Sequence, residues 1–103
     1  MRLVTISLTC ANTVEANDIV SALFEDNLVA CVKQEPVNST YRFKGKVESN
    51  EEVLLTIDTA EEKFREIEAV AKKLHSYHTP VLMAYPVINS SSGVKQWVEE
   101  SLK

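Results

Sequence analysis

The chain has few of the residues that interrupt regular structure or cross-link it. Its 103 residues include only 2 glycines, 3 prolines and 2 cysteines. The shortage of glycine and proline predicts long helices and strands joined by short connections, with no linker or low-complexity tract. Two cysteines are too few for a disulfide framework and are typical of free thiols in a reducing compartment. The length predicts a single domain over residues 1–103.

The sequence also lacks a long apolar run and an excess of positive charge. No segment approaches the roughly 20 apolar residues that cross a bilayer, and residues 1–7 alternate instead of forming the apolar core of a signal peptide. Eleven Lys and Arg against fifteen Asp and Glu give a net charge of -4. We therefore expect a cytoplasmic protein that binds neither nucleic acid nor a membrane.

Four segments have the patterns of β-strands. Three of them are residues 3–10, 30–43 and 47–58. Apolar and polar residues alternate over residues 3–10, and Val53, Leu55 and Ile57 alternate with Leu54 and Thr56, which is typical of strands with one buried face. The second and third of these segments are joined by Lys44-Gly45 and are expected to form a long hairpin. An almost wholly apolar segment, residues 81–88, predicts the fourth strand.

Two segments between the strands have the patterns of long helices. Capping-box spacings at Asn12 to Glu15 and at Thr59 to Glu62 predict where these helices begin. Apolar residues then recur at helical spacing over Ala16–Phe24 and Phe64–Leu74, and the acidic residues of the first helix, Glu15 included, are expected to face solvent.

The element order predicts an α+β fold. Strand, helix, strand, strand, helix, strand is the order of the ferredoxin-like βαββαβ sandwich, with an antiparallel sheet and both long helices on one face. Pro36, in the second strand, indicates an edge position or a bulge. A short terminal helix that carries Trp97 is expected after a cap at Ser91 or Ser92.

The pattern predicts that the sheet face away from the helices is apolar. If Val53, Leu55, Val81 and Met83 point toward the helices, the opposite face carries the residues Leu54, Leu82 and Ala84. An exposed apolar face indicates packing against another chain. The alternative is a monomer in which the terminal helix and Trp97 fold back over that face.

Several functions of this fold class are disfavoured by missing residues. An RNA-binding sheet needs aromatic residues on its central strands, and residues 51–58 contain none. A soft-metal chaperone needs a C-x-x-C pair, whereas Cys10 is followed by Ala11-Asn12-Thr13. An acylphosphatase-type anion loop needs glycine and arginine, which residues 8–14 lack. We therefore expect a protein that is not an enzyme.

A histidine pair is the most informative polar group. His75 and His78 are three residues apart at the end of a helix, where two imidazoles can converge on Cu, Zn or Ni. The alternative is that His75 only caps the helix terminus. Cys10 and Cys31 are single thiols in strands, which are typically small buried residues.

The hairpin tip carries a second polar group. Tyr41 and Phe43 stand beside Lys44 and Lys46, a mixture that suits a carboxylate or phosphate ligand. The alternative is that the lysines are ordinary solvated turn charges.

Short motifs are spread over almost the whole chain. They are Leu28-Val29-Ala30-Cys31-Val32, Ser39 with Tyr41 and Phe43 before Gly45-Lys46, Glu52-Val53-Leu54-Leu55 with Thr59, His75 with Tyr77 and Pro80, and Trp97 near the end. In this order and spacing they resemble the CutA family of divalent-cation-tolerance proteins. The resemblance implies a ferredoxin-like subunit in a homotrimer whose hairpins reach across neighbouring subunits.

The same resemblance implies a role in tolerance of copper and other divalent cations, with no required cofactor. The positions of the family's copper site hold Leu8, Leu74 and Val81, which cannot coordinate a metal. If this chain binds copper or another divalent metal, we expect the ligands to come from the nearby residues His75, His78 and Cys10.

Two alternatives remain. One is a sensor similar to the trimeric PII signal proteins, with an anionic ligand in an inter-subunit cleft. The other is a structural trimer that presents a surface to another protein. The cleft residues expected from the resemblance are Tyr41, Phe43, Lys46, Tyr77, Pro80 and Trp97.

Overall fold

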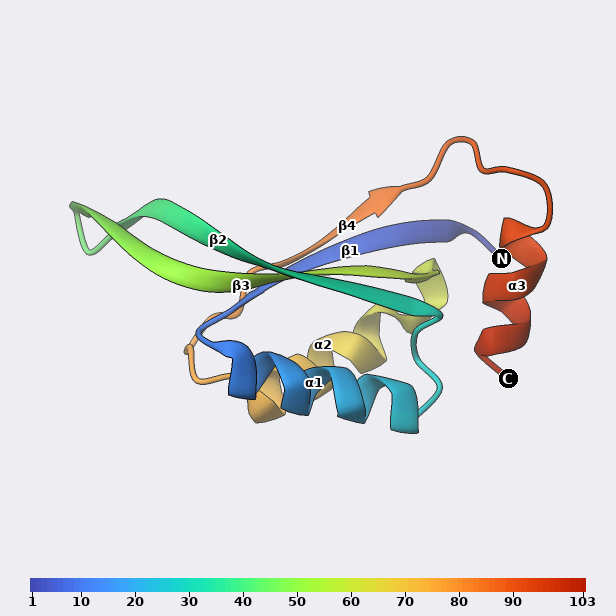
Figure 1. Ribbon diagram of the computed structural model, residues 1–103, viewed down its shortest axis with the longest axis horizontal. Coiled ribbons are helices and arrows are strands. Elements are labelled where there is room, and N and C mark those ends of the chain that lie inside the picture. The colour runs from blue at the N-terminus through green and yellow to red at the C-terminus, as the bar shows by residue number, and fades with distance from the viewer.

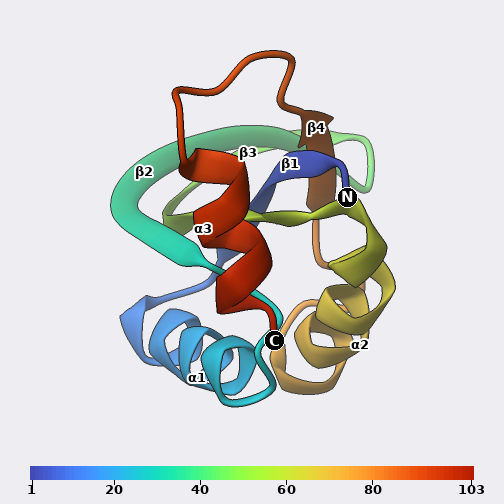
Figure 2. The ribbon, with the colours of Figure 1, turned by 90° about the vertical axis from the view of Figure 1, so that its right-hand side faces the viewer.

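The computed structural model describes all 103 residues and shows one sheet with helices on one side of it. The sheet has the order β2-β3-β1-β4, and each neighbouring pair of strands is antiparallel. Helices α1 and α2 lie side by side under the sheet (Figure 1), whereas α3 lies across one end of it, close to the N-terminus (Figure 2). The predicted α+β class is confirmed. The elements are β1 (Leu3–Cys10), α1 (Thr13–Glu25), β2 (Cys31–Phe43), β3 (Lys46–Ala60), the 3-10 turn η1 (Glu61–Lys63), α2 (Phe64–Leu74), β4 (Leu82–Pro86) and α3 (Val94–Ser101).

The core lies between the sheet and the two long helices. Strand β1 is central, and its alternation places Ile6, Leu8 and Cys10 on the helix side with no exposed surface. Leu55 and Ile57 of β3 lie directly opposite Leu8 and Ile6 and are equally buried. The period-two pattern of the sequence therefore gave the correct buried face for both central strands.

The hairpin of β2 and β3 is the longest feature and extends well beyond the helices (Figure 1). Its turn is formed by Lys44 and Gly45, whose φ angles are 50° and 79°. Two consecutive positive φ angles are what a two-residue hairpin turn matched to the strand twist requires. Pro36 lies on β2, which is an edge strand, as predicted.

The predicted orientation of β4 is wrong. Leu82 lies opposite the buried Leu8, so it faces the helices and packs against the core. Met83 lies opposite Ser7 on the other face and is about half exposed, and Val81 lies outside the strand and is also exposed. Because paired residues in an antiparallel sheet share a face, the register with β1 decides this orientation, and an almost wholly apolar segment carries no alternation that reveals it.

The open face of the sheet is also more polar than the sequence suggested. Its centre carries Thr5 and Asp58, whose side chains form a 3.1 Å hydrogen bond. Apolar side chains share this face, among them Leu54 opposite Thr9, and Met83 and Tyr85 opposite Ser7 and Thr5. Helix α3 packs at the end of the sheet, where Val94 and Trp97 line a pocket with Thr5 and Asp58, and it leaves Trp97 46% exposed.

Two of the three predicted helix starts differ from the structure. The Asn12 cap of α1 is confirmed, since its Oδ1 accepts a hydrogen bond of 2.9 Å from the Glu15 amide. Thr59 is not a cap: it lies in β3, and its buried hydroxyl donates to the Leu28 carbonyl oxygen at 2.6 Å. Helix α3 begins after Gly93, at a φ of 88°, instead of after a serine cap.

One strand boundary and one buried position predicted from apolar residues also differ from the structure. Strand β4 ends at Pro86 instead of residue 88, and Phe24, expected on the buried stripe of α1, is 45% exposed.

None of the helices has both the length and the apolar character needed to cross a membrane.

The Thr59 hydroxyl gives a test of the connection between β3 and the segment after α1. Thr59→Val keeps the shape of the side chain but leaves the Leu28 carbonyl oxygen without this donor. We expect the free energy of unfolding to fall by about 1–3 kcal/mol, measured by urea denaturation. The control is Thr56→Val, on the open face of the same strand. Equal losses in the two variants would contradict a role for this hydrogen bond.

Candidate functional site

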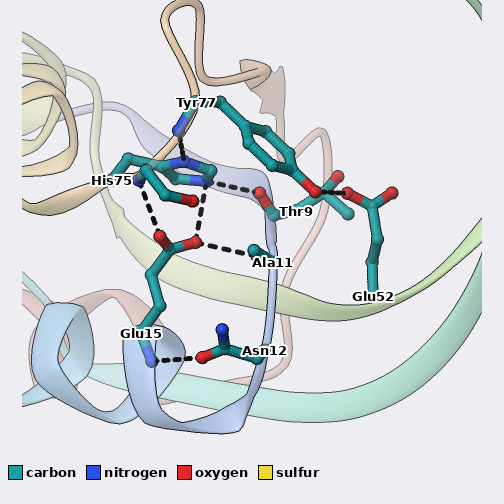
Figure 3. Close-up of polar contacts among 8 residues, drawn as sticks. Thr9, Ala11, Asn12, Glu15, Glu52, His75 and Tyr77 are labelled. Atoms are coloured by element: carbon teal, nitrogen blue, oxygen red, sulfur yellow. Dashed lines mark hydrogen bonds and ion pairs between the residues drawn. The ribbon is translucent and has the colours of Figure 1, made fainter.

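Three potential metal ligands meet where β1 ends, α1 begins and α2 ends. The Cys10 Sγ, a Glu15 carboxylate oxygen and a His75 ring nitrogen all lie within 4.8 Å of one another, and all three residues are buried. Cys10 is the last residue of β1, Glu15 is in the first turn of α1, and His75 directly follows α2. Figure 3 shows Glu15 and His75 with their hydrogen-bond partners.

Glu15 links the start of α1 to the end of α2. One carboxylate oxygen accepts a 2.8 Å hydrogen bond from the Ala11 amide, and the other accepts a 2.6 Å bond from the Ser76 amide (Figure 3). Because these bonds have a charged acceptor, they are stronger than bonds between neutral groups. The Glu15 side chain therefore holds together two segments that are 61 residues apart in the sequence.

His75 is held by hydrogen bonds at both ring nitrogens. Its Nδ1 accepts from the Tyr77 amide at 3.0 Å, so the proton of the neutral ring is on Nε2. Nε2 donates to the Thr9 carbonyl oxygen at 2.7 Å and lies 3.5 Å from the Glu15 carboxylate. The side chain has no exposed surface.

Burial raises the pKa of both acidic groups of this cluster, Cys10 and Glu15, but their net pKa shifts have opposite signs. Burial, together with the negative charges of Glu15 and Glu52, raises the pKa of the Cys10 thiol to about 12, so the thiol is protonated at neutral pH. Burial alone would raise the pKa of Glu15 as well. The hydrogen bonds from Ala11 and Ser76 and the adjacent His75 outweigh burial, and the net pKa of Glu15 is lowered.

The structure brings together only part of the predicted metal set. Cys10 and His75 are adjacent as expected, but His78 is exposed and is not in the cluster. Glu15 replaces it, although the sequence pattern placed Glu15 on the solvent side of α1. The available signal was its capping-box position, where a side chain turns back toward the residues before the helix.

The predicted cleft residues do not meet within one chain. Phe43 and Lys46 pair at the hairpin tip, whereas Trp97 is in α3 at the opposite end of the sheet (Figure 1). Tyr77 lies between these ends. Its hydroxyl donates at 2.5 Å to Glu52, a buried carboxylate that the sequence reading did not single out as a site residue.

The donors of the Cys10, Glu15 and His75 cluster fit a transition metal better than Ca²⁺ or Mg²⁺. Thiolate and imidazole are ligands for copper and zinc, whereas the alkaline-earth ions need several oxygen ligands. The three donor atoms already lie within 4.8 Å of one another. Metal binding therefore requires the release or transfer of protons and a local rearrangement of side chains, and the rest of the fold can stay as it is.

Glu15 gives a test of the electrostatics of this cluster. Its lowered pKa means that its contribution to stability is fully present above the usual value of 4.5 and is lost as the pH falls through the lower value of the folded state. Glu15→Gln must turn an NH₂ group toward one of two amide donors. We expect a loss of about 1–3 kcal/mol at neutral pH and a smaller difference from the wild type in acid.

The measurement is urea unfolding at a series of pH values. The control is Glu25→Gln, an exposed position on the same helix. A difference between Glu15→Gln and the wild type that does not change with pH would show that the carboxylate charge is not what holds the two segments together.

Known proteins resemble the chain over nearly its whole length. The sequence profile described as "CutA1 divalent ion tolerance protein" matches residues 4–101. The divalent-cation tolerance protein CutA of Archaeoglobus fulgidus is 33% identical over 98 residues, covering 95% of this chain and 96% of that protein. The human protein CutA is 33% identical over 94 residues, which are 90% of this chain and 52% of the human protein.

Solved structures agree with the sequence comparison. The structure described as the periplasmic divalent cation tolerance protein CutA of A. fulgidus has a TM-score of 0.95 and 32% identity, covering 98% of this chain and 99% of that one. CutA of Xylella fastidiosa has a TM-score of 0.94 and 29% identity, with both chains fully covered.

Proposed function

Because the chain belongs to the CutA1 family of divalent ion tolerance proteins, we propose that it supports tolerance by binding copper or a similar divalent metal at Cys10, Glu15 and His75. This proposal rests on one observation: a sulfur, an oxygen and a nitrogen donor lie within 4.8 Å of one another in a buried cluster. The metal is cargo in this role, and the proposed activity is sequestration without catalysis. The three donors leave His78 outside the site.

The chain's own groups set the conditions for binding. Cys10 must release its thiol proton, which the high pKa makes unfavourable until a cation is present to stabilise the thiolate. The His75 proton must move from Nε2 to Nδ1, where the Tyr77 amide now donates. Binding therefore requires a local rearrangement of residues 75–77, while Glu15 keeps the ends of α1 and α2 close together.

A metal titration tests this site. We expect Co²⁺, used as a spectroscopic probe, to give thiolate charge-transfer absorption with the wild type, and Cu²⁺ or Zn²⁺ to displace it. Cys10→Ser should abolish that absorption, and His75→Asn should weaken binding by about tenfold or more. The controls are Cys31→Ser and His78→Ala, which should bind as the wild type does. Loss of the absorption in Cys31→Ser, or its retention in Cys10→Ser, contradicts the proposal.

We further propose that the subunit is ferredoxin-like and acts as a cytoplasmic homotrimer. The strand order and the βαββαβα element order support the ferredoxin-like arrangement. The outer hairpin supports assembly, because a two-stranded ribbon without helices behind it is only marginally stable in water. Phe43 and Val47, near its tip, are 51% and 64% exposed in the single chain.

Sedimentation equilibrium tests the assembly. We expect a particle of about three times the chain mass of 11.5 kDa. Val47→Asp should lower the measured mass, because it places a charge on the hairpin surface that needs a neighbour. Val14→Asp, at a similarly exposed valine of α1, should not. A wild-type particle with the mass of one chain would refute the trimer.

A further inference from the structure

Glu52 is a buried carboxylate outside the Cys10, Glu15 and His75 cluster. Only 7% of the residue is exposed, and the Tyr77 hydroxyl donates to its carboxylate at 2.5 Å (Figure 3). It lies on β3 between Glu51 and Val53. Because strand residues alternate, Glu52 shares the open face of the sheet with Asn50 and Leu54.

The charge of Glu52 has no cationic partner in the chain. The ion pairs within 4.0 Å involve Glu61, Asp58, Glu68 and Glu15, and none involves Glu52. Buried carboxylates are normally paired with a positive group, because removing a charge from water is costly. Its hydrogen-bond partner cannot compensate it, because Tyr77 is a neutral phenol whose pKa is raised by burial and by the bond to Glu52.

Tyr41 adds a second aromatic ring near the Tyr77 hydroxyl, since Tyr41 is among the groups that raise the pKa of Tyr77. The Asn50 side chain donates to the Tyr41 hydroxyl on the same part of the hairpin. Tyr77 is 36% exposed, so the pair of Tyr77 and Glu52 can be reached from solvent at one side. The group therefore offers one negative charge, two phenol rings and several oxygen acceptors.

These groups suit a positively charged nitrogen better than a metal ion. A metal site needs three or more ligands, and the chain's compact ligand group does not include Glu52. An alkylammonium or guanidinium group needs only a carboxylate and a nearby aromatic surface. An anionic ligand, which the sequence suggested for this region, would be repelled by Glu52.

We propose that Glu52, Tyr77 and Tyr41 form a binding site for an alkylammonium or guanidinium group. Its nitrogen donates to the Glu52 carboxylate, and its carbon chain lies against the tyrosine rings. The cation comes either from a small free amine or from a lysine or arginine side chain of a second copy of this chain. None of these three residues is a ligand of the metal site proposed at Cys10, Glu15 and His75, although Tyr77 lies in the segment that metal binding would rearrange.

Calorimetry with butylamine and butylguanidine as probes tests the site, with butanol and butyrate as the neutral and anionic counterparts. If the cation is a free amine, we expect the two cations to bind the wild type and the counterparts not to bind. Glu52→Gln keeps an acceptor for Tyr77 but removes the charge, and should weaken cation binding by more than about tenfold. The matched control, Glu51→Gln, changes the exposed neighbouring carboxylate and should leave binding unchanged.

Thermal unfolding and sedimentation distinguish the two sources of the cation. If the cation is a free amine, Glu52→Gln should raise the melting temperature of the protein without ligand, because an unpaired buried charge is removed. If it comes from a second copy, the free probes need not bind, and Glu52→Gln should lower both the melting temperature and the particle mass. Tyr77→Phe removes the hydroxyl that donates to Glu52 and should also weaken cation binding or assembly. It is the second variant, to be used if Glu52→Gln does not fold.

The proposal is overturned if Glu52→Gln matches Glu51→Gln in binding, melting temperature and mass. It is also overturned if butyrate or butanol binds as well as butylamine. Saturable binding of Mg²⁺ or Zn²⁺ that depends on Glu52 and excludes butylamine would replace the ammonium site with a metal site.

Discussion

The pairing of β1 with β3 on one side and β4 on the other is the constraint on which the rest of the structure depends. This register places Leu8 opposite Leu55 and Leu82, so that one face of three strands becomes apolar together. Helices α1 and α2 cover that face. The same pairing ends at Cys10, and it therefore fixes where the polar residues that follow β1 can meet the end of α2.

A polar cluster buried at this junction has a structural role that does not depend on any ligand. Glu15 satisfies the Ala11 and Ser76 amides, and His75 satisfies the Thr9 carbonyl oxygen. These bonds close the end of the core, where strand and helix termini would otherwise leave backbone groups unpaired. A thiol, a carboxylate and an imidazole are consequently held close together by the same bonds that stabilise the fold, and this gives the metal proposal its physical basis.

The long hairpin has one part that the helices cover and one part that they leave uncovered. Near the helices, β2 and β3 contribute to a covered sheet, with Leu55 and Ile57 fully buried. Beyond the helices the same strands form an exposed ribbon. Glu52 lies where the covered part ends: it is buried by its neighbours, yet the chain supplies no positive charge for it. Both the exposed ribbon and the unpaired charge support the contacts proposed for this part of the molecule.

Local sequence patterns correctly predicted the element order, the buried faces of β1 and β3, the Lys44-Gly45 turn and the Asn12 cap. Each of these depends on residues close together in the chain, through alternation, turn geometry or a bond from residue i to i+3. Tertiary structure decided the facing of β4, the use of Thr59 as a donor to Leu28, and the grouping of Glu15 with His75 and of Glu52 with Tyr77. These contacts join segments far apart in the sequence, and strand register and helix packing, which local periodicity does not encode, determine which polar side chains are buried together.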